Sequence, residues 1–401
     1  MIRRSVGDDN TTPRNRSRAA APPLRRRRAG AGLALLVALL QTAALAQGPG
    51  GRKAPAIGVS PLPGMPPLLD QHDVYAGARP GLLSAAVRGH VPRIYVPNSG
   101  RGTVDVIDPA TFKIVDHFTV GREPQHVTPA YDLKSLWVLA DKGDSLTRID
   151  PVSGRRQQTV KVADPYNMYY TPDGRYAIVV AERKKRLDFR DAQTMALVKE
   201  VPVPCRGVDH MDFSANGRFL LASCEFSGQL VKVDVLEEKL LGVLQLPGHA
   251  MPQDVRLAPD GSVFFVADMM SNGVYVIDGE SMRIVKFIPT GRGTHGLYFS
   301  RDSTSLYASN RGESSIAVID VKTRAVATVW HIPGGGSPDM GGVSADGRVL
   351  WLSGRYHAEV YAIDTRDGHL LARIPVGKGP HGLCVWPQPG RYSLGHTGLM
   401  R

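Results

Sequence analysis

The stretch Ile94-Tyr95-Val96-Pro97-Asn98, followed after a short turn by Val104-Asp105-Val106-Ile107-Asp108, decides the fold of this chain of 401 residues. The first segment is mostly apolar with a polar end, and the second is a mainly apolar strand that ends in Asp. Six later segments match the first one, at 136–140, 177–181, 220–224, 264–268, 306–310 and 350–354. Their first residues lie 42, 41, 43, 44, 42 and 44 positions apart. The chain therefore repeats one unit of about 42 residues seven times.

Each repeat contains the signals of four short strands. The two segments above are followed by a third strand, as at 114–120 or 370–376, and a Gly/Pro-rich turn leads to a fourth strand that ends in a tight hairpin. The hairpins contain Asp-Gly or Asn-Gly, as at Asp173-Gly174 and Asn216-Gly217, which supply the positive φ angles of such turns. Seven four-stranded sheets packed radially bury both faces of each sheet and leave few exposed edges. The sequence predicts an all-β, seven-bladed β-propeller of four-stranded antiparallel blades over residues 81–401.

Two segments compete to complete the first blade. Residues 81–87 precede the first repeat, and residues 380–386 follow the last one and match the inner-strand pattern better. We expect 380–386 to be the inner strand of the first blade, and we expect 81–87 to add elsewhere to the seam where the ring closes.

The N-terminus predicts an export signal over residues 1–46. Four arginines at 25–28 precede an apolar stretch that ends in Ala44-Leu45-Ala46, a small-residue cleavage pattern. Residues 47–80 are rich in Pro and Gly and indicate an extended linker or a wrapping arm. We therefore expect a periplasmic or secreted protein, monomeric, with no membrane span in its mature chain. The export route and the cleavage of the signal stay open.

The net charge of +12 belongs largely to that N-terminus. Residues 1–46 hold nine Arg, no Lys and two Asp, which leaves 40 basic and 35 acidic residues, or +5, in the remainder. The one dense basic cluster there, 183–186, is interpreted as a solvated hairpin tip. We therefore expect no specific binding of nucleic acid.

Polar residues begin nearly every inner strand, as in Gln125-His126 and Tyr166-Asn167, and should converge at one mouth of the central channel. The ends of the following strands return to the same mouth. These positions vary between repeats while the apolar ones stay alike, which indicates a composite ligand site. The predicted site residues are His126, Asn167, His210, Asp254, His295, Asp339, His381, Glu182, Glu225, Asp268, Arg311 and Arg355. The alternative is that each side chain bonds loop backbone within its own blade.

The chemistry of these residues suggests what the mouth recognises. Arg311 and Arg355 are expected to orient a carboxylate or phosphate, and histidines with a pKa near 6.5 are expected to make binding depend on pH between 5 and 8. No metal site is predicted, because the mouth of a seven-bladed channel is expected to hold histidines of different blades more than about 4–5 Å apart. No catalytic residue is assigned and no cofactor is predicted, since the sequence has neither a G-x-S-x-G elbow nor a C-x-x-C-H motif.

The chain has three cysteines. If residues 214 and 219 pair across the hairpin, Asp209 faces Cys224 and Cys205 lies one short turn beyond. A disulfide between Cys205 and Cys224 is then feasible in an oxidising compartment, the alternative being two unrelated buried thiols. Cys384 lies in an apolar strand and is expected in the core.

The segments 94–98, 104–108, 120–121 and 171–174 resemble the YVTN-type propeller repeat. With the leader and the endings 380–382 and 390–396, residues 80–401 look like a YncE-like exported protein. The wider group includes the haem d1 domain of cytochrome cd1 nitrite reductase and the seven-bladed lactonases. The resemblance implies a periplasmic setting and a fold that can carry a cofactor or an enzyme site. We expect a module that binds a small molecule or a protein at its channel mouth; the alternatives are a lactonase-type hydrolase and a redox protein with a bound cofactor.

Overall fold

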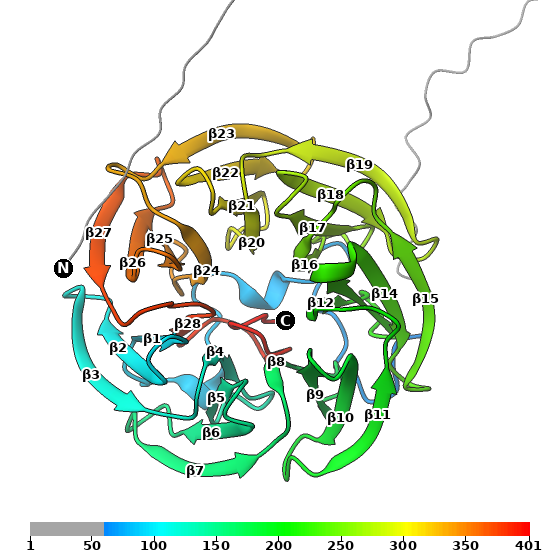
Figure 1. The fold of residues 1–401 in the computed structure, drawn as a ribbon, viewed down its shortest axis with the longest axis horizontal. Helices are drawn as coiled ribbons and strands as arrows, with labels where there is room; N and C mark the ends of the chain where they lie inside the picture. Colours follow the sequence, from blue (N-terminus) through cyan, green and yellow to red (C-terminus); the bar gives the residue numbers. More distant parts are fainter. Residues whose placement is uncertain (1–59) are drawn as a thin grey trace, which may run out of the picture. The chain divides into compact units, whose positions relative to one another are not determined.

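The computed structural model describes residues 60–401, which form seven four-stranded antiparallel sheets around a central channel (Figure 1). The predicted fold is confirmed. The predicted export signal and the first part of the arm, up to residue 59, lie outside the described residues. No helix in residues 60–401 is long and apolar enough to cross a membrane.

Each blade runs from an innermost strand at the channel to an outer strand at the rim, and we number the blades 1 to 7 along the chain. The innermost strands are β28 (Cys384–Trp386), β4 (Pro124–Pro129), β8 (Pro165–Tyr170), β12 (Val208–Phe213), β16 (Pro252–Leu257), β20 (Thr294–Phe299) and β24 (Pro338–Val343). The second strands are β1 (Arg93–Asn98), β5 (Leu136–Ala140), β9 (Tyr176–Ala181), β13 (Phe219–Cys224), β17 (Phe264–Asp268), β21 (Ser305–Asn310) and β25 (Val349–Gly354). The third strands are β2 (Thr103–Asp108), β6 (Ser145–Ile149), β10 (Arg186–Asp191), β14 (Gln229–Asp234), β18 (Gly273–Asp278), β22 (Ser315–Asp320) and β26 (Glu359–Asp364). The outer strands are β3 (Lys113–Thr119), β7 (Arg156–Lys161), β11 (Leu197–Pro202), β15 (Lys239–Gln245), β19 (Arg283–Pro289), β23 (Ala325–His331) and β27 (Leu370–Pro375).

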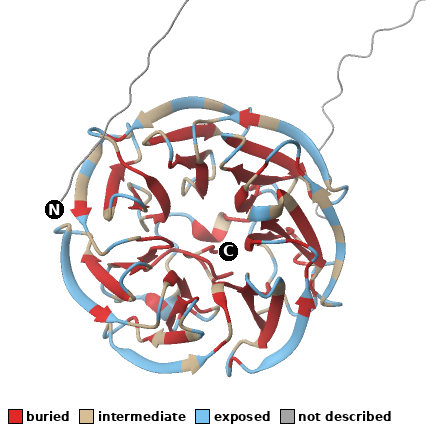
Figure 2. Ribbon diagram, viewed as in Figure 1, coloured by how far each residue is buried: buried red, intermediate tan, exposed pale blue. Residues whose placement is uncertain are grey.

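Burial follows this order of strands. The second strands are buried almost throughout, because both of their faces pack against neighbouring blades, while the outer strands are mostly exposed (Figure 2). Outer strands carry charged residues, such as Lys199 and Glu200, that discourage pairing with another chain.

A β-bulge lies at the start of every inner strand from β4 to β24. The pairing with the second strand shifts between Pro124 and His126 in β4, and between Thr294 and Leu297 in β20. Bulges add twist and redirect side chains, so the polar residues at these starts point away from the regular strand pattern. The bulge in β12 also shifts the expected register: Val208, and not Asp209, faces Cys224.

The C-terminal strand closes the ring as predicted. β28 pairs with β1, with Tyr95 opposite Cys384 and Arg93 opposite Trp386. Residues 81–87 contribute no strand to a blade; they contain the 3-10 turn η2 (Ala85–Val87), and Leu83 forms an isolated bridge with Gly390.

The described part of the arm packs against the ends of the inner strands. The backbone of Leu62 bonds to Asn216, and that of Val74 bonds to Pro259, at 2.8 Å each. The 3-10 turn η1 (Ala76–Ala78) follows Tyr75, which is buried. A third 3-10 turn, η3 (Glu225–Ser227), follows β13. Of the two interpretations of this segment, residues 60–80 therefore fit the wrapping arm.

The C-terminal tail runs beside the arm and enters the channel. Leu394 accepts a bond from the Tyr170 amide at 3.0 Å, and the His396 amide donates to the Met168 carbonyl at 2.8 Å. Gly395 has φ +92°, and a Cβ there would lie 2.4 Å from the Met168 carbonyl oxygen. Only glycine permits this close approach, which brings His396 to the channel axis.

Cys205 and Cys224 form a disulfide with Cα atoms 6.0 Å apart, and Cys384 is free and buried. We predict that a thiol probe will modify one cysteine per denatured, unreduced chain. Because the disulfide closes a loop across 19 positions, the variant Cys205→Ser/Cys224→Ser should lose about 2–4 kcal/mol in the free energy of unfolding. Three reactive thiols in the unreduced wild type would show that the bridge does not form.

Candidate functional site

An open cavity of about 390 Å³ lies where the inner strands begin. Its wall includes six of the predicted site residues. They are Glu182, Glu225, His295, Arg311, Arg355 and His381. Further polar side chains on the wall are Gln125, Tyr166, Gln253, Asp141, Glu123, Lys142 and Arg183, and Phe226, Met269 and Tyr356 add apolar surface. The size lies within the range of small-molecule sites.

Charge is separated across this mouth. Glu182 follows β9 in blade 3 and Glu225 follows β13 in blade 4, whereas Arg311 follows β21 in blade 6 and Arg355 follows β25 in blade 7 (Figure 1). The strand ends of a radial array point at one mouth, so the acids and the arginines come from opposite sides of the ring.

Most charges at the mouth have ion-pair partners. Lys142 lies 2.7 Å from Glu123, Arg183 lies 2.6 Å from Asp164, and Arg311 pairs with Asp339. Arg183 thus belongs to the ion pairs of the mouth rather than to a solvated hairpin tip.

Three mouth residues remain without such a partner. Within residues 60–401, Glu182, Glu225 and Arg355 take part in no ion pair. The Arg355 Nη1 instead donates a 3.3 Å hydrogen bond to the amide oxygen of Gln125.

Burial and mutual repulsion raise the pKa values of the acidic side chains at the mouth. Burial, followed by the charges of Asp141 and Glu225, raises the pKa of Glu182 to about 7. The pKa of Asp141 is also raised to about 7, first by burial and then by its contact with Asp164, and burial raises the pKa of Glu225. Glu182 and Asp141 therefore titrate near neutral pH, where a cationic ligand would hold them ionised.

The remaining predicted site residues lie beneath the mouth and are buried. Asp339 connects three blades: its carboxylate lies 3.1 Å from Arg311 Nε, 2.9 Å from His295 Nδ1 and 2.8 Å from His381 Nδ1. The Tyr166 hydroxyl lies 3.3 Å from His381 Nε2, which joins this network to the cavity wall.

Asp254 and Asp268 have structural contacts. Asp254 accepts the amide of Leu297 in the next blade at 2.9 Å and lies 3.3 Å from Arg256. Asp268 accepts the amides of Met270 and Ser271 in the turn that follows it, and the amide of Met251, which precedes β16 of the same blade. The structure therefore places neither residue on the cavity wall.

Three histidines gather on the channel axis. His126 of β4, His210 of β12 and His396 of the tail each offer a ring nitrogen, and these nitrogens all lie within 4.8 Å of one another. Asn167 lies behind them, 3.2 Å from His210 Nδ1 and 2.9 Å from His396 Nδ1. The expectation that histidines of different blades stay more than 4–5 Å apart is wrong, because the bulged strand starts and the inserted tail fill the channel.

The expected titration of these histidines between pH 5 and 8 is also wrong. Burial lowers the pKa of His126 to about 3 and that of His295 to about 4, and it holds the pKa of His210 and of His381 well below 6.5. The rings are neutral across that range, and Glu182 and Asp141 titrate there instead.

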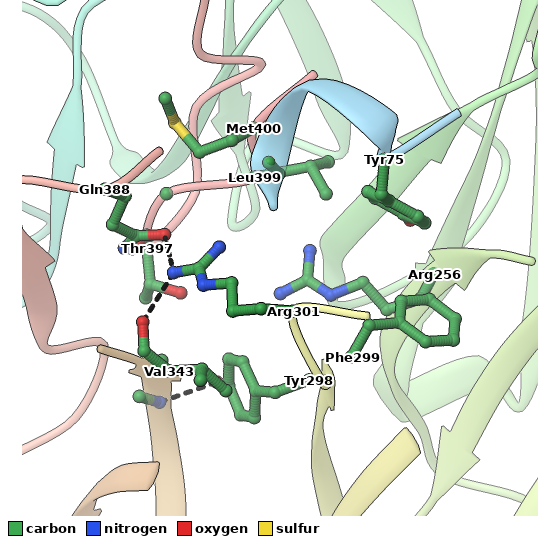
Figure 3. Close-up of a pocket in the computed structure, with 14 residues that line it drawn as sticks. Tyr75, Arg256, Tyr298, Phe299, Arg301, Val343, Gln388, Thr397, Leu399 and Met400 are labelled. Carbon is green, nitrogen blue, oxygen red and sulfur yellow. Dashed lines mark hydrogen bonds between the residues drawn. The ribbon is translucent and has the colours of Figure 1, made fainter. Parts of the chain in front are cut away.

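The opposite end of the channel contains a smaller cavity. Tyr75 of the arm, together with Leu399 and Met400 of the tail, covers a cavity of about 60 Å³ (Figure 3). The Arg301 guanidinium there bonds to the Val343 carbonyl and to Gln388. A space of this size holds a few water molecules rather than an organic ligand, so of these two cavities only the mouth cavity is large enough for a small molecule.

The family model described as a YNCE-like beta-propeller matches residues 77–389. The chain belongs to this YNCE-like family. Among curated proteins, none matches the sequence. The family resemblance found in the repeats is thereby confirmed.

Solved structures similar to this YNCE-like propeller share its fold at low identity. Dihydro-haem d1 dehydrogenase NirN in complex with DHE is 18% identical, with a TM-score of 0.56 over 76% of this chain and 77% of that one. Hydrazine synthase of Kuenenia stuttgartiensis is 19% identical, with a TM-score of 0.54 over 64% and 87%. A functionally unknown protein from Desulfotomaculum acetoxidans DSM 771 is 15% identical, with a TM-score of 0.62 over 73% and 98%. At such identities the likeness shows the fold alone.

Several residues in the site region of this YNCE-like propeller, Glu123 among them, were not predicted from the sequence. Phe226, Met269 and Tyr356 each directly follow a predicted mouth residue, and that adjacency was the available signal. His396 lies in an irregular tail, and no repeat position indicates where it goes.

We predict that Glu182→Gln removes a pH-dependent cost of folding. The pKa of this carboxyl rises from 4.5 in the unfolded chain to about 7 in the folded protein. Below pH 4.5 it is protonated in both states and costs no stability. As the pH rises toward 7 it ionises more readily in the unfolded chain, which destabilises the native state. The variant should therefore gain on the order of 1 kcal/mol over wild type at pH 8 and almost nothing at pH 4.5, allowing for partial solvent exposure. Urea unfolding at several pH values measures this difference, with the exposed Glu237→Gln as the control. Parallel curves for wild type and Glu182→Gln would refute the prediction.

Proposed function

We propose that this YNCE-like propeller binds a small molecule at the open mouth of its channel, and that this molecule carries both a cationic and an acidic group. The observation that carries the proposal is a set of charges on the cavity wall that have no ion-pair partner among residues 60–401: Glu182 and Glu225 on one side of the ring and Arg355 on the other. Partly buried charges without partners lose solvation, and a ligand of complementary charge compensates for that loss.

The wall offers contacts for each part of such a ligand. The Arg355 guanidinium bonds to Gln125 through Nη1 alone, so its other N–H groups remain for a carboxylate. Tyr356 is 69% exposed as a residue, and its ring contacts the Arg311 guanidinium, with 5.4 Å from the guanidinium carbon to the ring centroid. This ring supplies apolar surface for the middle of the ligand. The NirN structure, solved in complex with DHE, supports the idea that this fold can hold a small molecule.

The proposal is tested by thermal-shift assays and calorimetric titration. The ligands are a panel of zwitterions, with amines and carboxylates of the same size for comparison. We expect zwitterions to bind more tightly than either single-charge series. Arg355→Gln should weaken the best zwitterion about 10–100-fold, and Glu182→Gln/Glu225→Gln should act similarly, because each variant removes a charged hydrogen bond. Affinity should rise with pH through about 7 as Glu182 ionises.

The exposed charges Arg348 and Glu237 provide matched controls, since neither lines the cavity. Arg348→Gln and Glu237→Gln should leave affinity unchanged. A ligand that binds equally well to wild type, Arg355→Gln and Glu182→Gln/Glu225→Gln would place the binding site elsewhere.

A further inference from the structure

We infer that the channel holds a transition-metal ion, copper or zinc, bound by the Nε2 atoms of His126, His210 and His396. This inference goes beyond the ligand site at the mouth and does not depend on it. The three histidines, called here the axial triad, come from blade 2, blade 4 and the C-terminal tail.

The spacing of the axial triad suits one ion. The ring centroids lie 5.5 Å apart for His126 and His210, 5.4 Å for His126 and His396, and 5.0 Å for His210 and His396. Their candidate ligand atoms lie within 4.8 Å of one another. Metal–nitrogen bonds near 2.0–2.1 Å place ligand atoms about 3.3–3.6 Å apart in tetrahedral or trigonal geometry. Small side-chain rotations therefore bring the three nitrogens onto one ion.

The free nitrogens of the axial triad are a second, independent observation. All three side chains are 0% exposed, and the Nε2 of each is buried without a hydrogen-bond partner in residues 60–401. A buried polar atom without a partner costs about 1–3 kcal/mol. Three such atoms converging at one point are explained together by a shared metal ion.

The other ring nitrogens have contacts of the kind that orient metal-ligating histidines. The Nδ1 of His126 donates to the Tyr166 carbonyl at 2.9 Å, which leaves its Nε2 lone pair free. The Nδ1 atoms of His210 and His396 both face the Asn167 amide. In the structure the Asn167 Nδ2 faces both Nδ1 atoms, and its Oδ1 accepts the Met168 amide at 2.8 Å. Metal binding at the two Nε2 atoms moves each ring proton to Nδ1, and rotation of the Asn167 amide then lets its oxygen accept both protons at the cost of the bond from Met168.

The chemistry of the donors selects the ion. Neutral imidazoles suit copper and zinc, whereas magnesium and calcium prefer carboxylate and carbonyl oxygens. The Asp254 carboxylate lies 3.9 Å from His396 Nε2 and supplies negative charge close to the ion.

The test starts from chelator-stripped wild type loaded with Zn²⁺, with Cu²⁺, or with Cu⁺ under a reductant, then desalted and measured for metal content. We expect about one retained ion per chain for at least one of these metals. His126→Asn and His210→Asn keep a polar atom near the position of Nδ1 and remove Nε2. Loss of a residue that only supports a metal ligand weakens binding roughly 10–100-fold. Each of these variants removes a ligand itself and should weaken binding by at least that much.

Two histidine variants serve as matched controls. His295 is buried in the same channel but faces Asp339, and His369 belongs to an exposed group with Asp364 and Asp367. His295→Asn and His369→Asn should retain the metal as wild type does. Loss of metal from His369→Asn but not from His210→Asn would assign the ion to the surface and overturn the inference.

X-ray absorption on loaded wild type keeps the inference testable if the triad variants fold poorly. Three imidazole nitrogens at about 2.0–2.1 Å are expected in the first shell. A first shell of oxygen donors, or no retained ion of any of the three kinds, would overturn the inference.

Discussion

Replacing Asp339 by alanine is expected to lower the free energy of unfolding by about 3–5 kcal/mol at pH 7. The carboxylate is 0% exposed and contacts Arg311 and His295 of blade 6 and His381 before β28 of blade 1. Its removal leaves the buried Arg311 guanidinium without its counter-charge and disconnects blades 6, 7 and 1 at the channel. Denaturant unfolding, followed by far-UV circular dichroism, measures the loss.

The pH dependence of this loss has a definite sign. Arg311 and the two histidines hold the pKa of Asp339 well below its usual range although burial opposes them. A carboxyl with a lowered folded pKa stabilises above its unfolded pKa of about 3.9 and loses that contribution as the pH falls. The difference between wild type and Asp339→Ala should therefore stay constant from pH 5 to 8 and shrink below about pH 4.

The control for Asp339→Ala is Glu280→Ala. Glu280 pairs with Lys232 at 3.2 Å, but its side chain is 72% exposed, so its loss should cost less than about 1 kcal/mol. Equal losses in the two variants would show that Asp339 does not organise the channel.

Asp212→Ala is expected to cost a similar 3–5 kcal/mol, for a different reason. Asp212 is 0% exposed and accepts the Leu257 amide at 2.8 Å, the Tyr75 hydroxyl at 3.3 Å and the Arg401 guanidinium at 2.9 Å. One carboxylate thus holds blade 5, the N-terminal arm and the C-terminal tail together. Arg401 itself is 4% exposed, with its guanidinium carbon 4.5 Å from the Tyr75 ring centroid.

A double-mutant cycle isolates the pair. Because Asp212→Ala leaves a buried cation and Arg401→Met leaves a buried anion, the double variant should be more stable than the sum of the two losses predicts, by about 1–3 kcal/mol. Denaturant unfolding of the four proteins gives this coupling energy. Strict additivity would mean that the tail is not anchored through this contact.

Sequence alone predicted the ring because the physics of each blade is local and repeats seven times. Short apolar runs with polar ends predict the strands, and Asp-Gly and Asn-Gly predict the hairpins. Strand β28 pairs with β1 in the first blade because residues 380–386 carry the inner-strand pattern. The same topology identified one mouth as the meeting point of inner-strand starts and second-strand ends. Glu182, Glu225 and Arg355 could therefore be placed there before the structure was known.

Only the tertiary structure determined how deeply those side chains are buried and which partners they contact. Bulges at the inner-strand starts turned His126, His210 and Asp339 inward, where burial lowers the pKa of both histidines, while Arg355 stayed on the cavity wall. A bulge shifts the register by a single residue, which the pattern of apolar residues does not encode. His396 reaches the axis because its non-repeating tail bonds to strand β8 across the ring. A contact between segments so distant in sequence depends on the completed fold, so no local pattern could have revealed it.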